Sequence, residues 1–158
     1  MARLKIGLIT TSDTRTPAED TAGAALRALC EECGWEVVAY RLCADDRECI
    51  AEIISGMAEV EGCDIVLTAG GTGLGPRDVT PEATLDACER EVPGIAEAIR
   101  AESLAITKRA MLSRGTAAVH KQTLVINFPG SEKAARESFA VVAEQLEHAV
   151  EMMAGGGH

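Results

Sequence analysis

Buried strand-like runs alternate with amphipathic helices along the first half of the chain, and this alternation limits the possible folds more than any other feature. The runs "RLKIGLIT" (3–10), "EVVAYRL" (36–42) and "DIVLT" (64–68) are separated by helical periodicity over 20–34 and again from Asp45 onward. Strands joined by helices of this length indicate a parallel sheet with right-handed crossovers. We therefore expect an α/β fold whose sheet is covered by helices on both faces.

Local signals predict where three of the helices begin. Asp20 is a candidate N-cap of the first helix. Asp45 stands three residues before Glu48, which is the spacing of a capping box at the start of the second helix. Thr80 precedes Pro81, so we expect Thr80 to cap a third helix with proline at its first position.

The second half of the chain is less regular. A helix is predicted over 93–105, and the stretch 106–118, which holds "LSRG", follows without clear periodicity. The apolar run "TLVINF" (123–128) predicts a further strand. A closing helix from Ser131 to about Met153 carries one continuous apolar stripe, which we interpret as core.

Length and composition place this pattern in one ordinary domain. The 158 residues are 47% hydrophobic and 25% charged, so we expect a single domain over 1–154 and a frayed tail over 155–158. Without an apolar run near 18 residues or a cleavable leader, we expect a cytoplasmic protein with no membrane segment.

The formal net charge of −10 disfavours nucleic acid as a partner. The six cysteines are expected to be reduced thiols.

The glycine-rich stretch "TAGGTGLGPRDVTPEAT" (68–84) is the strongest functional signal. It places four glycines in six positions directly after a central strand, at the sheet edge where open α/β proteins bind ligands. Successive inward N–H groups of such a loop form an anion-binding concavity. The stretch has no Walker A ending and is one residue short of GxGxxG. A tight strand-to-helix turn without a ligand is the alternative.

Charged residues at the same edge favour a ligand. Arg77 offers a forked donor for phosphate, whereas Asp78 would repel an anion unless a cation lay between them. Asp45 and Asp13 also follow strands at their carboxyl ends, although capping and turn formation would explain them equally. Carboxylates near a phosphate loop suggest Mg²⁺.

Taken in order, "GLITTSD", "DTAG", "CADD", "LTAGGTGLGPRDVTPEAT", "LSRG" and "NFPGS" cover nearly the whole chain, and this sequence resembles the MoaB/Mog family of molybdenum cofactor biosynthesis. The resemblance implies a three-layer α/β/α sandwich of the molybdopterin-binding type with a mostly parallel sheet. It implies a homotrimer or homohexamer. It also implies an enzyme that transfers AMP from Mg-ATP to the terminal phosphate of molybdopterin and releases pyrophosphate, preparing the pterin for a partner that inserts the metal.

The resemblance also assigns roles to individual residues. It makes Asp45 and Asp78 catalytic, acting through Mg²⁺. It assigns substrate and phosphate binding to a larger set: Ser12, Asp13, Gly70, Gly71, Thr72, Gly73, Arg77, Thr80, Ser113, Arg114, Pro129, Gly130 and Ser131. Within that set, the "LSR" pair is expected near the pterin phosphate and the "PGS" loop on the nucleotide side.

Two other functions remain open at this stage. Some short members of the family lack activity, so a protein that holds or delivers molybdopterin without adenylylating it is the main alternative. A nucleotide pyrophosphatase is a weaker one. The chain departs from the family pattern at Ala44, at Ala69 and in "TAAVHK" (116–121), and these departures bear on turnover more than on binding.

Overall fold

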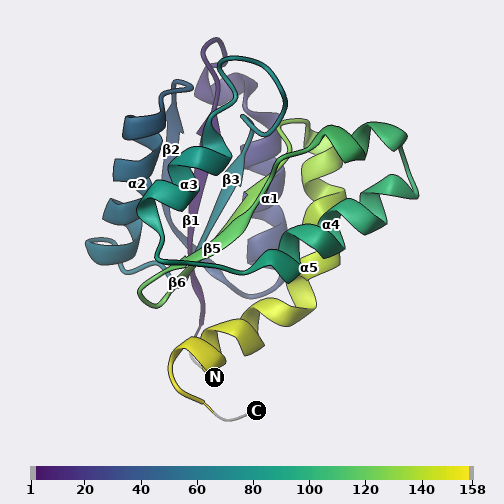
Figure 1. Ribbon diagram of the computed structural model, residues 1–158. Helices are drawn as coiled ribbons and strands as arrows, with labels where there is room; N and C mark the ends of the chain where they lie inside the picture. The colour runs from purple at the N-terminus through teal and green to yellow at the C-terminus, as the bar shows by residue number, and fades with distance from the viewer. Residues whose placement is uncertain (1–2, 157–158) are drawn as a thin grey trace.

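A six-stranded sheet with helices on both faces forms the protein (Figure 1), here as a computed structural model that describes residues 3–156. The strands lie in the order β2-β1-β3-β6-β5-β4. Their bounds are β1 Lys5–Thr11, β2 Glu36–Cys43, β3 Ile65–Ala69, β4 Arg90–Glu91, β5 Ala117–His120 and β6 Thr123–Phe128. The helices are α1 Thr21–Glu32, α2 Arg47–Glu59, α3 Thr80–Ala87, α4 Pro93–Leu104 and α5 Glu132–Met153, with 3-10 helices η1 Pro17–Glu19 and η2 Lys108–Leu112.

The sheet is mostly parallel, as the alternation predicted. Strands β2, β1, β3 and β6 run parallel, with Ile65 paired to Ile6 on one side and to Leu124 on the other. Strands β5 and β4 complete the sheet in the antiparallel sense. Every residue of β3 and β6 is buried, which explains why both strands are mostly apolar on both faces.

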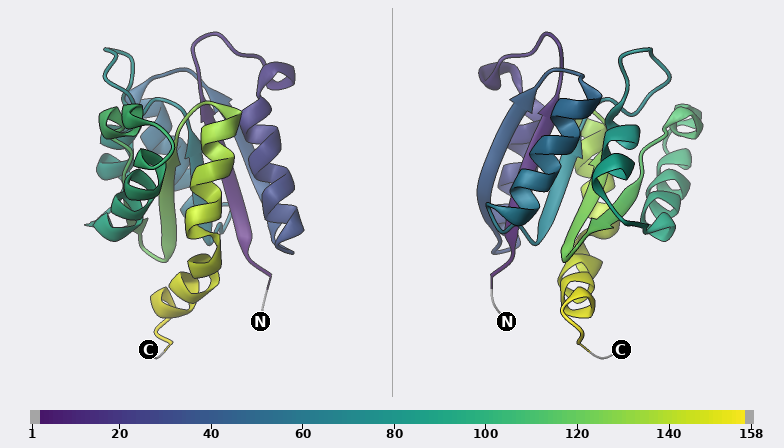
Figure 2. Two further views of the ribbon diagram at one scale, coloured as in Figure 1. Left: turned by 90° about the vertical axis from the view of Figure 1, so that its right-hand side faces the viewer. Right: turned by 60° about the vertical axis from the view of Figure 1, so that its left-hand side comes forward.

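Helices cover the two faces of the sheet, so the three-layer prediction is confirmed (Figure 2). Helices α1, α4 and α5 pack on the core that contains Leu8, Leu67 and Phe139. Helices α2 and α3 pack on the other core, which contains Ile9 and Val66. Neighbouring strand residues thus alternate between the two cores.

Helix α5 follows its prediction closely. The Ser131 hydroxyl accepts a hydrogen bond from the Ala134 N–H at 3.2 Å and caps the helix. The predicted stripe faces the core, with Ala135, Phe139 and Leu146 buried. After the helix, the N–H groups of residues 155 and 156 donate to carbonyls of its last turn, and His158 lies outside the described residues.

Two helix starts differ from prediction by one residue. Asp46, rather than Asp45, caps α2, because its carboxylate accepts from the Cys49 N–H at 2.8 Å. Thr80 is the first residue of α3 and not its N-cap, since its N–H donates to the Gly71 carbonyl at 3.2 Å. In both cases the N–H of the expected cap is bound outside the helix, by the Asp13 carboxylate for Asp45 and by the Gly71 carbonyl for Thr80.

The irregular stretch contains structure that the sequence did not predict. Residues 108–112 form η2, and Ala117–His120 forms β5. A tight turn joins β5 to β6, with Lys121 at φ 54°. Because β5 is short and half alanine, its sequence lacks the β-branched pattern of a strand.

All six cysteines are free thiols. Burial raises the pKa of the Cys30 thiol to about 12, so the Cys30-x-x-Cys33 pair has none of the thiolate character of a redox motif. None of the helices within residues 3–156 is long and apolar enough to cross a membrane.

Candidate functional site

The glycine-rich loop between β3 and α3 forms the centre of the site, at the carboxyl edge of the parallel strands (Figure 1). Gly70 and Gly71 have φ values of +105° and +68°. A Cβ atom on Gly70 would lie 2.6 Å from the Thr11 carbonyl oxygen, and one on Gly71 would overlap the Thr80 hydroxyl. Glycine is therefore required at both positions by conformation and by space.

Hydrogen bonds anchor both ends of this loop to the sheet edge. At its start, the Gly70 N–H donates to the Phe128 carbonyl at 3.0 Å. At its end, the buried Thr80 hydroxyl lies 3.3 Å from the Thr11 hydroxyl. The carboxylate of Asp78 folds back over the loop and accepts from the Gly75 N–H at 2.8 Å.

Asp13 and Asp45 lie on the outer side of the loop. The Asp45 N–H donates to Asp13 Oδ1 at 3.0 Å. Burial and then the charge of Asp13 raise the pKa of the Asp45 carboxyl, and Asp78 adds to the same effect. The sheet edge therefore gathers three aspartates from three different loops, which we call the aspartate cluster (Asp13, Asp45 and Asp78).

Arg77 is the cation that balances this cluster. Its guanidinium makes two bonds of 3.0 Å to the Asp13 carboxylate. This pairing is the main reason that the pKa of Asp13 is lowered. Arg77 is thus at the site where the sequence placed it, but it contacts a carboxylate, and both side chains are exposed enough to exchange partners.

Arg114, expected near the pterin phosphate, makes its contacts within the protein. Its guanidinium donates to the Gly73 carbonyl at 2.8 Å, to the Asp78 carbonyl at 2.7 Å and to the Glu82 carboxylate at 2.5 Å. Its backbone N–H donates to the Thr72 carbonyl at 2.8 Å. All of these contacts hold the glycine-rich loop against α3, so Arg114 supports the loop.

A cavity of about 520 Å³ opens on the inner side of the loop, between α4, η2 and the start of α5. Its lining includes four predicted residues, Thr72, Gly73, Ser113 and Pro129. The remaining lining residues are Leu74, Ile99, Arg100, Ser103, Thr107, Arg109, Ala110, Leu112, Ala134 and Glu137. We call it the loop cavity.

Two arginines of the loop cavity were missed by the sequence analysis. Arg100 is half-buried and donates to the Gly115 carbonyl at 2.7 Å. Arg109 is exposed at the cavity wall, and within residues 3–156 its guanidinium has no hydrogen-bond or ion-pair partner. The basic pair at 108 and 109 just before the "LSR" motif was the available signal, but it lies in the stretch that was interpreted as irregular.

The remaining predicted residues lie around the site without lining the loop cavity. The Ser12 hydroxyl accepts from the N–H groups of Thr14 and Arg15, which shapes the first loop. The Gly130 carbonyl accepts from the Arg15 guanidinium at 2.9 Å, and Ser131 caps α5.

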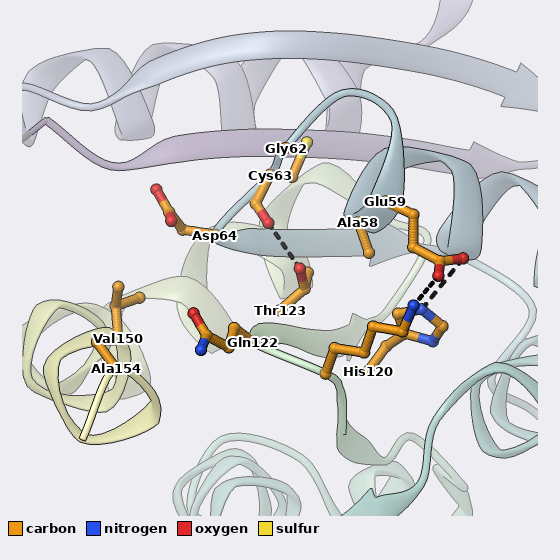
Figure 3. Close-up of a pocket in the computed structure, with 11 residues that line it drawn as sticks. Ala58, Glu59, Gly62, Cys63, Asp64, His120, Gln122, Thr123, Val150 and Ala154 are labelled. Atoms are coloured by element: carbon orange, nitrogen blue, oxygen red, sulfur yellow. Dashed lines mark hydrogen bonds and ion pairs between the residues drawn. The ribbon is translucent and has the colours of Figure 1, made fainter.

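No preformed metal centre is present among residues 3–156, since no group of three or more His, Cys, Asp or Glu side chains there has the geometry to hold an ion. A second cavity, also about 520 Å³, lies at the opposite edge of the sheet (Figure 3). It is lined by residues such as Glu59, Asp64 and Gln122 and contains none of the predicted site residues.

Comparison with known proteins gives one consistent family. Residues 7–148 match the family described as "Probable molybdopterin binding domain". The molybdopterin adenylyltransferase of Helicobacter pylori is 34% identical over 159 residues, covering 98% of this chain and 90% of that protein. The molybdenum cofactor synthesis protein cinnamon of Drosophila melanogaster is 38% identical over 97% of this chain, which spans only 26% of that longer protein.

A solved structure agrees with the sequence comparisons. The molybdopterin biosynthesis enzyme MoaB from Thermus thermophilus has 43% sequence identity to this chain and a TM-score of 0.88. The match covers 96% of this chain and 97% of that one.

Proposed function

The chain belongs to the molybdopterin-binding domain family of molybdenum cofactor biosynthesis, and from this membership we propose that it transfers AMP from Mg-ATP to the terminal phosphate of molybdopterin. A phosphate oxygen of the pterin attacks the α-phosphorus of ATP, the bond from that phosphorus to the bridging oxygen breaks, and pyrophosphate leaves. The observation that carries the proposal is the aspartate cluster beside a glycine-rich loop whose other side lines a cavity.

The loop cavity is the site we propose for the pterin. Leu74, Ile99 and Leu112 offer apolar contact to a flat ring system, and Arg109 offers an unused guanidinium at the wall. A forked guanidinium is well suited to binding a terminal phosphate. The Ser113 hydroxyl at the same wall adds a donor.

The aspartate side of the loop is the site we propose for the triphosphate. Backbone N–H groups of the loop can donate to phosphate oxygens, because a glycine-rich backbone lets a ligand approach closely. An incoming phosphate also competes with Asp13 for Arg77, whose two bonds are exposed to solvent. The terminal phosphate of the pterin and the α-phosphate of ATP then come into contact beside the loop. The role of the chain is to fix the relative positions of these two groups.

Magnesium fits the residues on this side. Arg77 pairs with Asp13 alone, and the raised pKa of Asp45 reflects burial and like charges that a cation would relieve. Mg²⁺ typically binds one or two protein carboxylates together with substrate phosphates. Two protein ligands, Asp45 and Asp78, fit this pattern. The side chains of residues 3–156 form no complete metal site without such phosphates. When bound, the ion neutralises charge on the phosphates.

Isothermal titration with Mg-ATP tests the nucleotide side. Asp78→Asn keeps an oxygen that can accept from the Gly75 N–H and removes only the charge, so we expect a folded protein with at least tenfold weaker Mg-ATP binding. Asp86→Asn is the matched control, because that carboxylate forms a surface pair with Arg47. Unchanged Mg-ATP affinity in Asp78→Asn would refute the role given to the cluster.

A carrier that binds molybdopterin without adenylylating it is the second candidate. The observation that favours it is the separation of the loop cavity from the aspartate cluster by the loop itself. Titration separates the two functions: a carrier binds the pterin with no measurable affinity for Mg-ATP, whereas the transferase binds both.

A further inference from the structure

Glu137 is the one carboxylate among residues 3–156 that lines the loop cavity, and the proposed function gives it no role. It lies in the second turn of α5, and its side chain is 30% exposed. Its ion pair is a weak one, because Lys133 Nζ is 4.0 Å away on a side chain that is 83% exposed. Within the described part of the chain, the Glu137 carboxylate accepts no hydrogen bond.

The two guanidinium groups of the loop cavity do not neutralise Glu137. Arg100 on α4 donates to the Gly115 carbonyl at 2.7 Å, and neither Arg100 nor Arg109 forms an ion pair with Glu137 among the described residues. Helix α4 packs against both η2 and α5 (Figure 2), so Arg109 and Glu137 belong to different walls of the cavity. The loop cavity therefore offers an anion-binding group on one wall and a hydrogen-bond acceptor on another.

A carboxylate in a cavity selects for a ligand that donates hydrogen bonds. An ionised carboxylate can only accept, and it binds two adjacent N–H donors in a forked geometry. The 2-amino-4-oxo edge of a pterin has such a pair, because its amino group stands next to a ring N–H. Adenine has one amino group next to a ring nitrogen that only accepts, and a carboxylate repels that nitrogen. Glu137 thus faces two ring systems that it can distinguish.

We propose that Glu137 recognises the donor edge of the pterin ring and keeps adenine out of the loop cavity. The ring then lies against Ile99 and Leu112, with its terminal phosphate directed to Arg109 on the other wall. This inference rests on the proposed pterin site in the loop cavity, but it does not require that AMP is transferred. Guanine has the same donor edge, so a guanine nucleotide is the alternative source of this chemistry.

Isothermal titration without ATP tests the recognition directly. The probes are the phosphate ester of 6-hydroxymethylpterin and the matching lumazine ester, in which an oxygen replaces the 2-amino group. Both keep a phosphate for Arg109, so their affinities differ through the ring edge alone. Wild-type protein should bind the pterin ester about tenfold or more tightly than the lumazine ester. GMP is titrated as a third probe, and tighter binding of GMP than of the pterin ester would overturn the pterin assignment.

Glu137→Gln tests the residue. Glutamine replaces one of the two acceptor oxygens with a donor, so the variant should bind the pterin ester about tenfold more weakly relative to the lumazine ester. The ratio of the two affinities is the decisive readout, because a change in fold or in overall charge affects both esters alike. Glu144→Gln is the matched control, since Glu144 is exposed on the same helix and does not line the cavity. If Glu137→Gln kept the wild-type ratio, the proposal would be wrong.

The titrations also separate this inference from the proposed reaction. A wild type that prefers the pterin ester but releases no pyrophosphate from Mg-ATP would refute the transferase and leave the role of Glu137 intact. A wild type that transfers AMP but binds both esters equally would refute the role of Glu137 and leave the transferase intact.

Discussion

The N–H of Asp45 donates to Oδ1 of Asp13 over 3.0 Å, although the two residues are 32 positions apart in the chain. This bond holds Asp45 just before α2 without using it as the helix cap, which is Asp46. It also brings a second carboxylate close to Asp45. The charge on Asp13 is, after burial, the largest cause of the raised pKa of Asp45.

The raised pKa predicts how Mg-ATP binding depends on pH. Because protonation neutralises Asp45 at a higher pH than an ordinary aspartate, affinity should begin to fall at a higher pH than an ordinary aspartate would give. Asp13→Asn removes one repelling charge but keeps an acceptor for the Asp45 N–H, so the acidic fall should move to lower pH. Titrations of wild type and variant across this range give the comparison, and an unmoved acidic limb contradicts the coupling.

Gly70→Ala should destabilise the fold. At φ +105° a side chain is strained, and its Cβ would lie 2.6 Å from the Thr11 carbonyl; we expect a loss of about 2–3 kcal/mol in the free energy of unfolding. Gly56→Ala is the control, and we expect it to change stability in the opposite direction. Gly56 is inside α2 with open space around it, so alanine should stabilise by about 0.5–1 kcal/mol. Urea unfolding measures both, and equal effects would contradict the account of the loop.

Arg114→Lys tests the support of the loop. A lysine cannot reach Gly73, Asp78 and Glu82 together, so carbonyls would lose their donors at a cost of about 1–3 kcal/mol in the free energy of unfolding. Arg136→Lys, in a surface pair with Glu132, should change stability by about 0.5 kcal/mol or less. If Arg114→Lys were as stable as this control, the contacts of Arg114 with the loop would not stabilise the fold, and its guanidinium could bind the ligand instead.

Arg109→Ala tests the cavity side. If its guanidinium binds the terminal phosphate of the pterin, its loss should weaken molybdopterin binding roughly tenfold or more, with no effect on Mg-ATP binding. Lys108→Ala is the neighbouring control, since Lys108 does not line the cavity. Equal effects of the two changes on pterin binding would indicate general charge attraction and no specific contact.

The sequence was informative where structure depends on local pattern. Apolar periodicity located the core face of α5, and the strand-helix alternation located the sheet edge that carries the glycine-rich loop. The cap of α2 was placed one residue early because two aspartates are adjacent and only the bond from Asp45 to Asp13 distinguishes them.

Partners that come from distant segments could not be predicted. Nothing near Arg114 indicates that its guanidinium reaches Gly73 and Glu82, and nothing near Arg77 indicates a pairing with Asp13. Arg109 was missed for a related reason. It becomes part of a cavity wall only when η2 folds against α4 and the loop.

Pyrophosphate release from Mg-ATP, with and without freshly prepared molybdopterin, is the measurement that tests the central claim most directly. Asp45→Ala and Asp78→Ala are measured beside the wild type, with Asp86→Ala on helix α3 as the control. The account predicts pterin-dependent release by the wild type and the control, and its loss in both cluster variants. A folded wild type that binds the pterin but releases no pyrophosphate would contradict the account and make this protein a carrier.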